Sequence, residues 1–189
     1  AAATRMDKLV DALLLLSKVT RSEMSFRRVD LSAMAADIAN ELRDRSPDRD
    51  VMFDIQPGVC AYGDDKLLRP LLTNLIENAW KYTSRHECAH IEFGAVEKAG
   101  RREFFVRDDG AGFDMAYANK LFRPFELLHG NEFTGLGIGL ATASRIVRRH
   151  GGSIWSEGEV EKGATSPSDQ IDPPCLRTIR RHGGSIWSE

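Results

Sequence analysis

Apolar positions recur along the chain with two different periods, and these periods predict a mixture of helices and strands. Spacings of three and four residues predict helices, which are expected over residues 6–24, 30–43, 65–82 and 140–149. Short apolar runs bounded by turn residues predict strands, which are expected over residues 51–55, 59–62, 89–96, 103–107 and 153–156. Asp30 is the expected N-cap of the second helix, and Asp64 or Asp65 is the expected N-cap of the third.

The third helix has a polar face opposite its core face. The core face is predicted to comprise Leu72, Leu75, Ile76 and Ala79. The polar face presents Asn74, Glu77, Asn78 and Lys81. Such faces are usually only solvated, but two asparagines lower helix stability, which favours a function for the amides. A carboxylate beside an amide oxygen suits a hard cation or a positioned water, and the lysine could meet a phosphate. From this helix alone, both interpretations stay open.

Two glycine-rich loops follow the third helix. The segment Asp108–Asp114, DDGAGFD, ends a predicted strand, where glycines let the backbone approach a flat group and an Asp can accept from an amino group. Turns use the same pattern often. The second loop leads into the helix 140–149 with three alternating glycines, Gly135, Gly137 and Gly139. Exposed N–H groups at a helix N-terminus form a phosphate cradle, although this loop is neither a Walker loop nor a convincing dinucleotide fingerprint.

Composition narrows the classes of partner. With 189 residues, 42% of them hydrophobic and 29% charged, the chain can form one core with room for a small second module. A net charge of -2 and the lack of a long basic run give no argument for nucleic acid or for an anionic membrane surface. The longest apolar run, Ala12–Leu16, is too short to span a bilayer, and no signal-peptide pattern is present. The three cysteines lack metal-site spacing, which indicates a reducing cytoplasm.

The two ends of the chain pose separate questions. Residues 6–24 have an apolar face too broad for a lone helix, so we expect partner helices or a second subunit, with packing on its own domain as the alternative. The ten residues Arg148–Glu157 recur letter for letter at Arg180–Glu189. Two copies are too few for a solenoid, and we favour a duplication or frameshift artefact. A structural alternative is that the second copy adds to an open sheet edge.

Three boxes in this order, NLIENAWKY, DDGAGF and GLGIGL, with FRPF between the last two, resemble the catalytic domain of sensor histidine kinases. That family belongs to the ATPase superfamily of gyrase B, Hsp90 and MutL. The local sequence around these motifs is most similar to that of phytochrome-like and PAS-linked kinases. The resemblance implies an α+β, two-layer sandwich with a mixed, mostly antiparallel sheet under helices. It also implies three parts: residues 1–28 as the second helix of a dimerisation hairpin, 29–165 as the ATP-binding domain, and 166–189 as an aberrant tail.

The resemblance further assigns roles around the phosphates. It implies that Asn78 coordinates Mg²⁺ with Asn74 beside it, and that Glu77 orients or polarises the attacking group. Four further residues would contact the phosphates of ATP, namely Lys81, Gly135, Gly137 and Gly139.

Around the base, the resemblance implies that Asp108 accepts a hydrogen bond from the adenine amino group, with Gly110 and Gly112 leaving room for the ring. Tyr82 would line the nucleotide pocket. The mobile lid would span residues 122–134 and include Phe122 and Phe125.

Four departures from the family pattern bear on activity. Asp109 replaces the usual Asn and adds negative charge near the nucleotide, and Leu136 replaces a small or hydroxyl residue. After Thr165 the family's closing strand is expected to be lost, because the segment Ser166–Pro174 is rich in turn residues. None of the five histidines matches the phosphoacceptor. His86 alone precedes an acidic residue, and we interpret it as a loop residue.

The function implied is an ATP- and Mg²⁺-binding module that transfers the γ-phosphoryl group to a His on a segment absent from this chain, so the chain alone should not phosphorylate itself. The phosphate would then pass to a response regulator receiver domain. The full-length protein would be a homodimer through the N-terminal helix, and cytoplasmic or membrane-attached. One alternative is a non-catalytic nucleotide-binding or dimerisation module with a degenerate site, and another is an ATPase that hydrolyses ATP to water.

Overall fold

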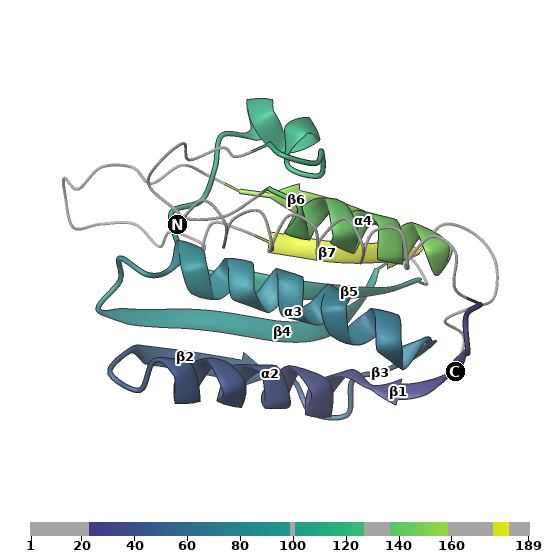
Figure 1. Cartoon of the computed structure of the whole chain (residues 1–189), viewed down its shortest axis with the longest axis horizontal. Helices are drawn as coiled ribbons and strands as arrows, with labels where there is room; N and C mark the ends of the chain where they lie inside the picture. The colour runs from purple at the N-terminus through teal and green to yellow at the C-terminus, as the bar shows by residue number, and fades with distance from the viewer. Residues whose placement is uncertain (1–22, 99–100, 127–136, 159–175, 182–189) are drawn as a thin grey trace, which may run out of the picture.

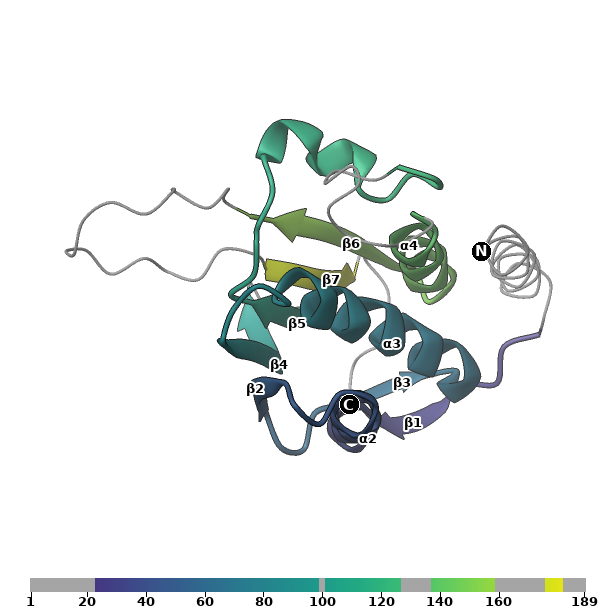
Figure 2. The same ribbon diagram turned by 60° about the vertical axis from the view of Figure 1, so that its left-hand side comes forward.

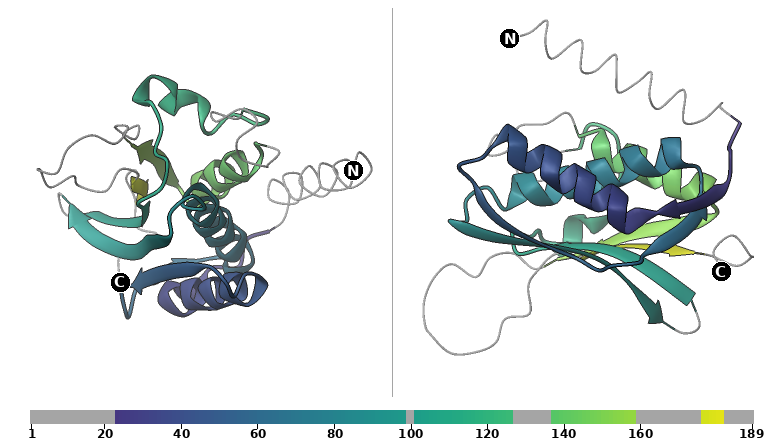
Figure 3. Two further views of the ribbon diagram at one scale, coloured as in Figure 1. Left: turned by 90° about the vertical axis from the view of Figure 1, so that its left-hand side faces the viewer. Right: turned by 90° about the horizontal axis from the view of Figure 1, so that it is seen from below.

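A five-stranded sheet carries three helices on one face in the computed structural model, which describes residues 23–98, 101–126, 137–158 and 176–181 (Figure 1). The strand order is β2 (Asp50–Ile55), β4 (Cys88–Lys98), β5 (Arg101–Asp108), β7 (Leu176–Arg181) and β6 (Gly152–Glu157). The β2–β4 pair is parallel, and the other three pairs are antiparallel. The helices α2 (Leu31–Arg45), α3 (Asp65–Tyr82) and α4 (Gly139–Arg149) lie side by side over this sheet (Figure 3, right). This confirms the predicted two-layer fold with a mixed, mostly antiparallel sheet.

The core lies between the helices and the sheet. The predicted core face of α3 is buried, since Leu72, Leu75, Ile76 and Ala79 are each at most 2% exposed. Each aliphatic side chain buried in this way contributes roughly 1.5–3 kcal/mol relative to its exposed state. Burial of this face fixes which side of α3 remains for the polar residues.

The helix starts follow the predicted caps. The Asp30 side chain accepts from the Ala33 N–H at 2.9 Å and begins α2. Asp64 rather than Asp65 caps α3, because its Oδ1 accepts from the N–H groups of Lys66 at 2.9 Å and Leu67 at 3.3 Å. Satisfying these otherwise unpaired donors stabilises the first turn of each helix.

A small second sheet, absent from the predictions, joins the segment before α2 to the segment before α3. It pairs β1 (Arg27–Asp30) with β3 (Cys60–Gly63) in antiparallel register (Figure 2). The sequence RRVD has a single buried position, Val29, so periodicity could not reveal this strand. The expected helix over residues 6–24 and the dimerisation hairpin lie almost wholly outside the described residues.

The expected loss of the closing strand is wrong. Strand β7, from the segment after the turn-rich linker, lies between β5 and β6 and pairs with both. The segment that enters the sheet is Leu176–Arg181, which precedes the repeated GGSIWSE, and it fills an internal position rather than an edge. Most of the repeat, residues 182–189, lies outside the described residues.

Along the described ranges, we find no helix with both the length and the apolar character that crossing a bilayer requires.

Candidate functional site

Asn74 brings the polar face of α3 against the start of α4. Its Nδ2 donates to the Pro70 carbonyl at 2.8 Å, which turns Oδ1 toward Gly139. A Cβ at position 139 would lie 2.7 Å from this Oδ1, closer than carbon and oxygen can approach. Ile138, the N-cap of α4, has no side-chain acceptor for the first N–H groups of the helix. The side-chain amide of Asn74 therefore lies next to the positive, N-terminal end of α4.

Gly137 lies two residues before the first residue of α4 and packs against the backbone of Phe125 and Glu126. The Phe125 N–H donates to the Gly137 carbonyl at 2.9 Å, and both residues have a φ of 68°. A Cβ on Gly137 would meet the Glu126 carbonyl oxygen at 2.7 Å, so glycine is required by space as well as by conformation. This contact joins Phe125, in the first part of the expected lid, to the segment just before α4. Gly135, Leu136 and lid residues 127–134 lie outside the described residues.

The expected lid aromatics differ in their surroundings. Phe122 is partly buried and packs against the core, whereas Phe125 is 57% exposed. Of these two aromatic residues, Phe125 is thus the one that is open to contact with a ligand or a neighbouring segment.

The first glycine loop packs against the C-terminal end of α3. A Cβ on Gly110 would lie 2.7 Å from the Tyr82 carbonyl carbon and oxygen, and the Ala111 N–H donates to this oxygen at 3.2 Å. Gly112 adopts a positive φ of 61°. The sequence suggested that Gly110 leaves room for a ring, whereas the structure shows that its missing side chain makes room for the backbone of Tyr82.

Asp108 lies at the start of this loop and is buried, with 1% of its surface exposed. Its Oδ1 accepts from the Gly110 N–H at 3.2 Å. A buried carboxylate is costly unless donors surround it, so this position suits an acceptor for an amino group. The geometry is compatible with the base-reading role that the resemblance implies.

The polar face of α3 is divided between two neighbours. Asn74 faces α4, but the Glu77 carboxylate pairs with Arg45 of α2, with 3.3 Å between Nη1 and Oε1. The Glu77 side chain is 44% exposed, and this pair continues through exposed ion pairs among Arg45, Glu41 and Arg69. Helical spacing predicted the shared face but not this division.

Lys81 and Tyr82 form a pair of their own at the end of α3. The Lys81 ammonium lies 4.5 Å from the centre of the Tyr82 ring, and its Nζ is 3.4 Å from the Tyr82 hydroxyl oxygen. This cation–π contact holds the positive charge next to the glycine loop. Asn78 is half-buried, one turn before Tyr82, between the two ends of the site.

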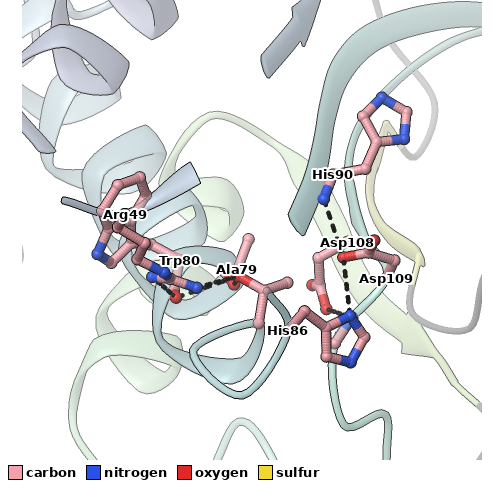
Figure 4. A network of polar contacts seen from close by, with 9 residues as sticks. Arg49, Ala79, Trp80, His86, His90, Asp108 and Asp109 are labelled. Carbon is pink, nitrogen blue, oxygen red and sulfur yellow. Dashed lines mark hydrogen bonds and ion pairs between the residues drawn. The ribbon is translucent and has the colours of Figure 1, made fainter. Parts of the chain in front are cut away.

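A polar cluster beside the glycine loop was not predicted as part of the site (Figure 4). Asp109 Oδ1 accepts from the His90 N–H at 3.0 Å and lies 3.7 Å from His86 Nδ1. The guanidinium of Arg49 stacks on Trp80, with 4.4 Å between its Cζ and the ring centre. Desolvation lowers the pKa of Arg49, and the charge of Asp109 opposes this shift. A DD pair at the end of a strand is the only sequence signal for this cluster.

A second buried polar group, His150, joins α4 to the start of α3. Its Nδ1 donates to the Ile146 carbonyl at 2.8 Å, and its Nε2 accepts from the Asp64 N–H at 3.1 Å. Both bonds suit the neutral ring, and burial lowers the pKa of His150 from its ordinary value. This residue lies at the far end of α4 from Gly139 and serves to hold the two helices together.

The residues present fit a magnesium nucleotide. Within the described ranges no group of three or more His, Cys, Asp or Glu side chains could hold a metal by itself. Amide oxygens on α3 beside a helix N-terminus instead suit Mg²⁺ that shares its ligands with phosphates and water. Asn78 would supply the protein oxygen with Asn74 beside it, and the close approach at Gly139 would let the backbone of α4 reach a phosphate.

Comparisons with known proteins agree with the observed fold and with the three sequence motifs described above. The profile of the family "histidine kinase-, DNA gyrase B-, and HSP90-like ATPase" matches residues 63–167. Cyanobacterial phytochrome A of Nostoc sp. (strain PCC 7120) is 34% identical over 163 residues, which are 85% of this chain and 21% of the phytochrome. The adaptive-response sensory kinase SasA of Trichormus variabilis is 30% identical over 169 residues, covering 86% of this chain and 42% of the kinase. The chain thus spans about a fifth of the length of its phytochrome relative.

Solved structures show the same fold. Full-length ShkA in complex with AMPPNP superposes with a TM-score of 0.71 at 22% identity, covering 94% of this chain and 35% of that one. The mycobacterial sensor histidine kinase MprB gives 0.63 at 21% identity, covering 82% and 95%. The chain therefore belongs to the histidine kinase-, DNA gyrase B- and HSP90-like ATPase family and contains an ATP-binding domain of the histidine-kinase type.

Proposed function

We propose that this domain binds Mg-ATP between α3, α4 and the glycine loop, and that it transfers the γ-phosphoryl group to a histidine on another segment or chain. One observation carries the proposal: the contact between Asn74 and Gly139 puts an amide face against a helix N-terminus, with the buried Asp108 on the same side of the sheet. Phosphoryl transfer depends mainly on positioning and charge neutralisation, and these groups provide both.

The individual roles that we propose are those that the family resemblance implies. Asp108 would accept from the amino group of adenine, Asn78 would coordinate Mg²⁺, and Lys81 would contact a phosphate. Glu77 would orient or polarise the attacking histidine, for which its carboxylate has to leave or share Arg45. Mg²⁺, when bound, supplies charge neutralisation at the phosphates.

The partners proposed are those of a phosphorelay. The phosphohistidine would pass its phosphate to an Asp of a response regulator receiver domain, and residues 6–24 would pair with a second copy in a dimer. None of the five histidines lies where the acceptor is expected, so we propose that this chain alone does not phosphorylate itself.

The test of nucleotide binding is calorimetry with ADP in the presence and absence of Mg²⁺. Asp108→Ala should abolish measurable binding because the base loses its acceptor, and Asn78→Ala should remove the dependence on Mg²⁺. Asp54→Ala is the matched control, since Asp54 is exposed on β2, away from the site. A folded sample that binds no nucleotide, or an Asp108→Ala variant that binds normally, would refute the proposal.

The test of transfer adds a separate hairpin that carries the acceptor histidine, with radiolabelled ATP. A kinase would label the hairpin, and Glu77→Gln should lower the labelling rate roughly 100-fold with little change in nucleotide affinity. Nucleotide binding without labelling would support the non-catalytic module, and steady phosphate release without any hairpin would support an ATPase.

A further inference from the structure

The end of β5 is unusual because a side chain replaces a backbone acceptor there. The register pairs Ile91 of β4 with Asp108 of β5, so His90 and residue 109 come next in the ladder. The Asp109 N–H donates to the His90 carbonyl at 3.3 Å, as an antiparallel pair requires. The return bond from the His90 N–H goes to Asp109 Oδ1 at 3.0 Å, where a continuing strand would offer a carbonyl oxygen.

This replacement lets the chain leave the sheet immediately after Asp108. The ladder stays satisfied on the β4 side, while the backbone from Gly110 turns onto the end of α3. There the Ala111 N–H donates to the Tyr82 carbonyl at 3.2 Å. Asp108 thus lies between two anchor points of the backbone. One is the bond from the His90 N–H of β4 to the Asp109 side chain, and the other is the bond from the Ala111 N–H to the Tyr82 carbonyl of α3.

The carboxylate of Asp109 lies close to His86, His90 and Arg49 of the protein itself. His86 Nδ1 lies 3.7 Å from the same Oδ1 that accepts from His90, and Figure 4 shows His86 and His90 on either side of Asp109. Arg49 is close enough for its charge to interact with that of Asp109. The adjacent Asp108 is the like charge in this group, and its carboxylate turns back to the Gly110 N–H.

We propose that Asp109 is a positioning residue for recognition of the nucleotide base: its side chain ends β5 and fixes the Asp108 carboxylate and the glycine turn against α3. This inference rests on the proposed function. It assigns a role to a residue that the sequence analysis noted only as an added negative charge near the nucleotide. The requirement is for an acceptor oxygen at this position, and an Asn side chain also provides one.

Three substitutions separate the acceptor from the charge. Asp109→Ala removes both, Asp109→Asn keeps the oxygen and removes the charge, and Asp109→Glu keeps the charge but moves the oxygen by one methylene. Calorimetry with Mg-ADP should show a dissociation constant raised about tenfold for Ala and for Glu, with most of the affinity restored in Asn. The exposed Asp54→Ala variant again serves as the control.

A second ligand separates base recognition from general damage to the fold. Inorganic tripolyphosphate with Mg²⁺, measured by competition against a fluorescent ATP analogue, contacts only the phosphate end. Its affinity should be unchanged in all three variants. Equal losses for ADP and tripolyphosphate, normal ADP binding by Asp109→Ala, or an Asn variant as weak as Ala would each overturn the inference.

The outcomes also distinguish this inference from the proposed function. A folded wild-type chain that binds neither ADP nor ATP overturns both. If the wild-type chain binds ADP and the Asp109→Ala and Asp109→Glu variants bind it with the wild-type affinity, only the role of Asp109 is overturned. If the Ala variant fails to fold, the Glu and Asn pair still decides the question.

Discussion

At the scale of single residues, two glycines of the site are required for different neighbours. The missing side chain of Gly110 leaves space for backbone atoms of Tyr82, which cannot move without disturbing α3. The missing side chain of Gly139 leaves space for the amide of Asn74, which can rotate away. The two positions therefore respond differently to the same added methyl group.

We expect Gly110→Ala to lower the free energy of unfolding by roughly 1–3 kcal/mol, because the methyl group overlaps immovable backbone atoms. Gly139→Ala should cost less than about 1 kcal/mol, since alanine favours the helix while Asn74 adjusts. Both should weaken ADP binding, and urea titrations beside calorimetry would measure the two effects. Equal destabilisation by the two substitutions would contradict this account.

His150 makes the stability of the fold sensitive to acid. Burial lowers its pKa below the ordinary value of 6.5, so the unfolded chain takes up a proton at a higher pH than the folded chain does. The stability that neutral His150 contributes is fully present well above pH 6.5 and is lost as the pH falls below it, so the folded chain should be less stable at pH 5.5 than at pH 6.5.

Urea unfolding at these two pH values measures this loss. His150→Gln should be less stable at neutral pH because two buried hydrogen bonds are lost, but it should show a weaker dependence on pH. A His150→Gln variant with an unchanged pH slope would exclude His150 as the source.

At the scale of helices and strands, the sequence predicted α2, α3 and α4 well because each has a regular apolar face, and α2 and α3 also begin at a clear N-cap. It could not predict β1, which has one buried residue, or β7, whose pairing partners lie far away in the chain. The arginine pair shows why: Arg148–Arg149 ends a helix, whereas the identical Arg180–Arg181 ends a strand. Tertiary contacts decide between the two conformations.

The dependence on tertiary contacts also limits what the sequence could predict about the site. The residue types on α3 and in the glycine loops were visible in the sequence. The Asn74–Gly139 contact, the pairing of Glu77 with Arg45 and the bond from His90 to Asp109 join segments that are distant along the chain. Periodicity places residues on a face, but only the packing of elements selects the partner of each face.

The caps of α2 and α3 should differ in importance. Asp64 accepts from Lys66 and Leu67 and also from the Ser25 N–H at 2.8 Å, and it is 4% exposed. Asp30 accepts from Ala33 at an exposed site. We expect Asp64→Ala to cost about 2 kcal/mol and Asp30→Ala about 1 kcal/mol in urea unfolding. The reverse order would contradict the role of Asp64 in joining the N-terminal segment to α3.

At the scale of the whole molecule, β7 is the only described strand that pairs with β6 and joins it to the rest of the sheet. Removal of β7 would leave β5 and β6 with unpaired edges and would loosen the contact of α4 and β6 with the remaining sheet.

We expect deletion of residues 166–189 to lower the free energy of unfolding by roughly 2 kcal/mol or more, because the hydrogen bonds of two ladders are lost. Deletion of residues 182–189 alone keeps β7 and is the matched control. Urea unfolding and light scattering would report the loss of stability and any association through the exposed edges. Equal stability of the two truncated chains would show that β7 contributes nothing.

The position of β7 also has a kinetic consequence. Its partner β5 is distant in sequence, so the loop between them must close before the pair can form, and such contacts slow folding. Strand β6 can join the sheet only after β7 has paired, so α4, which also packs on β6, gains this part of its support late. We expect the affinity for nucleotide to develop more slowly during refolding than the helical signal, with the phosphate end of the site as the last part to mature.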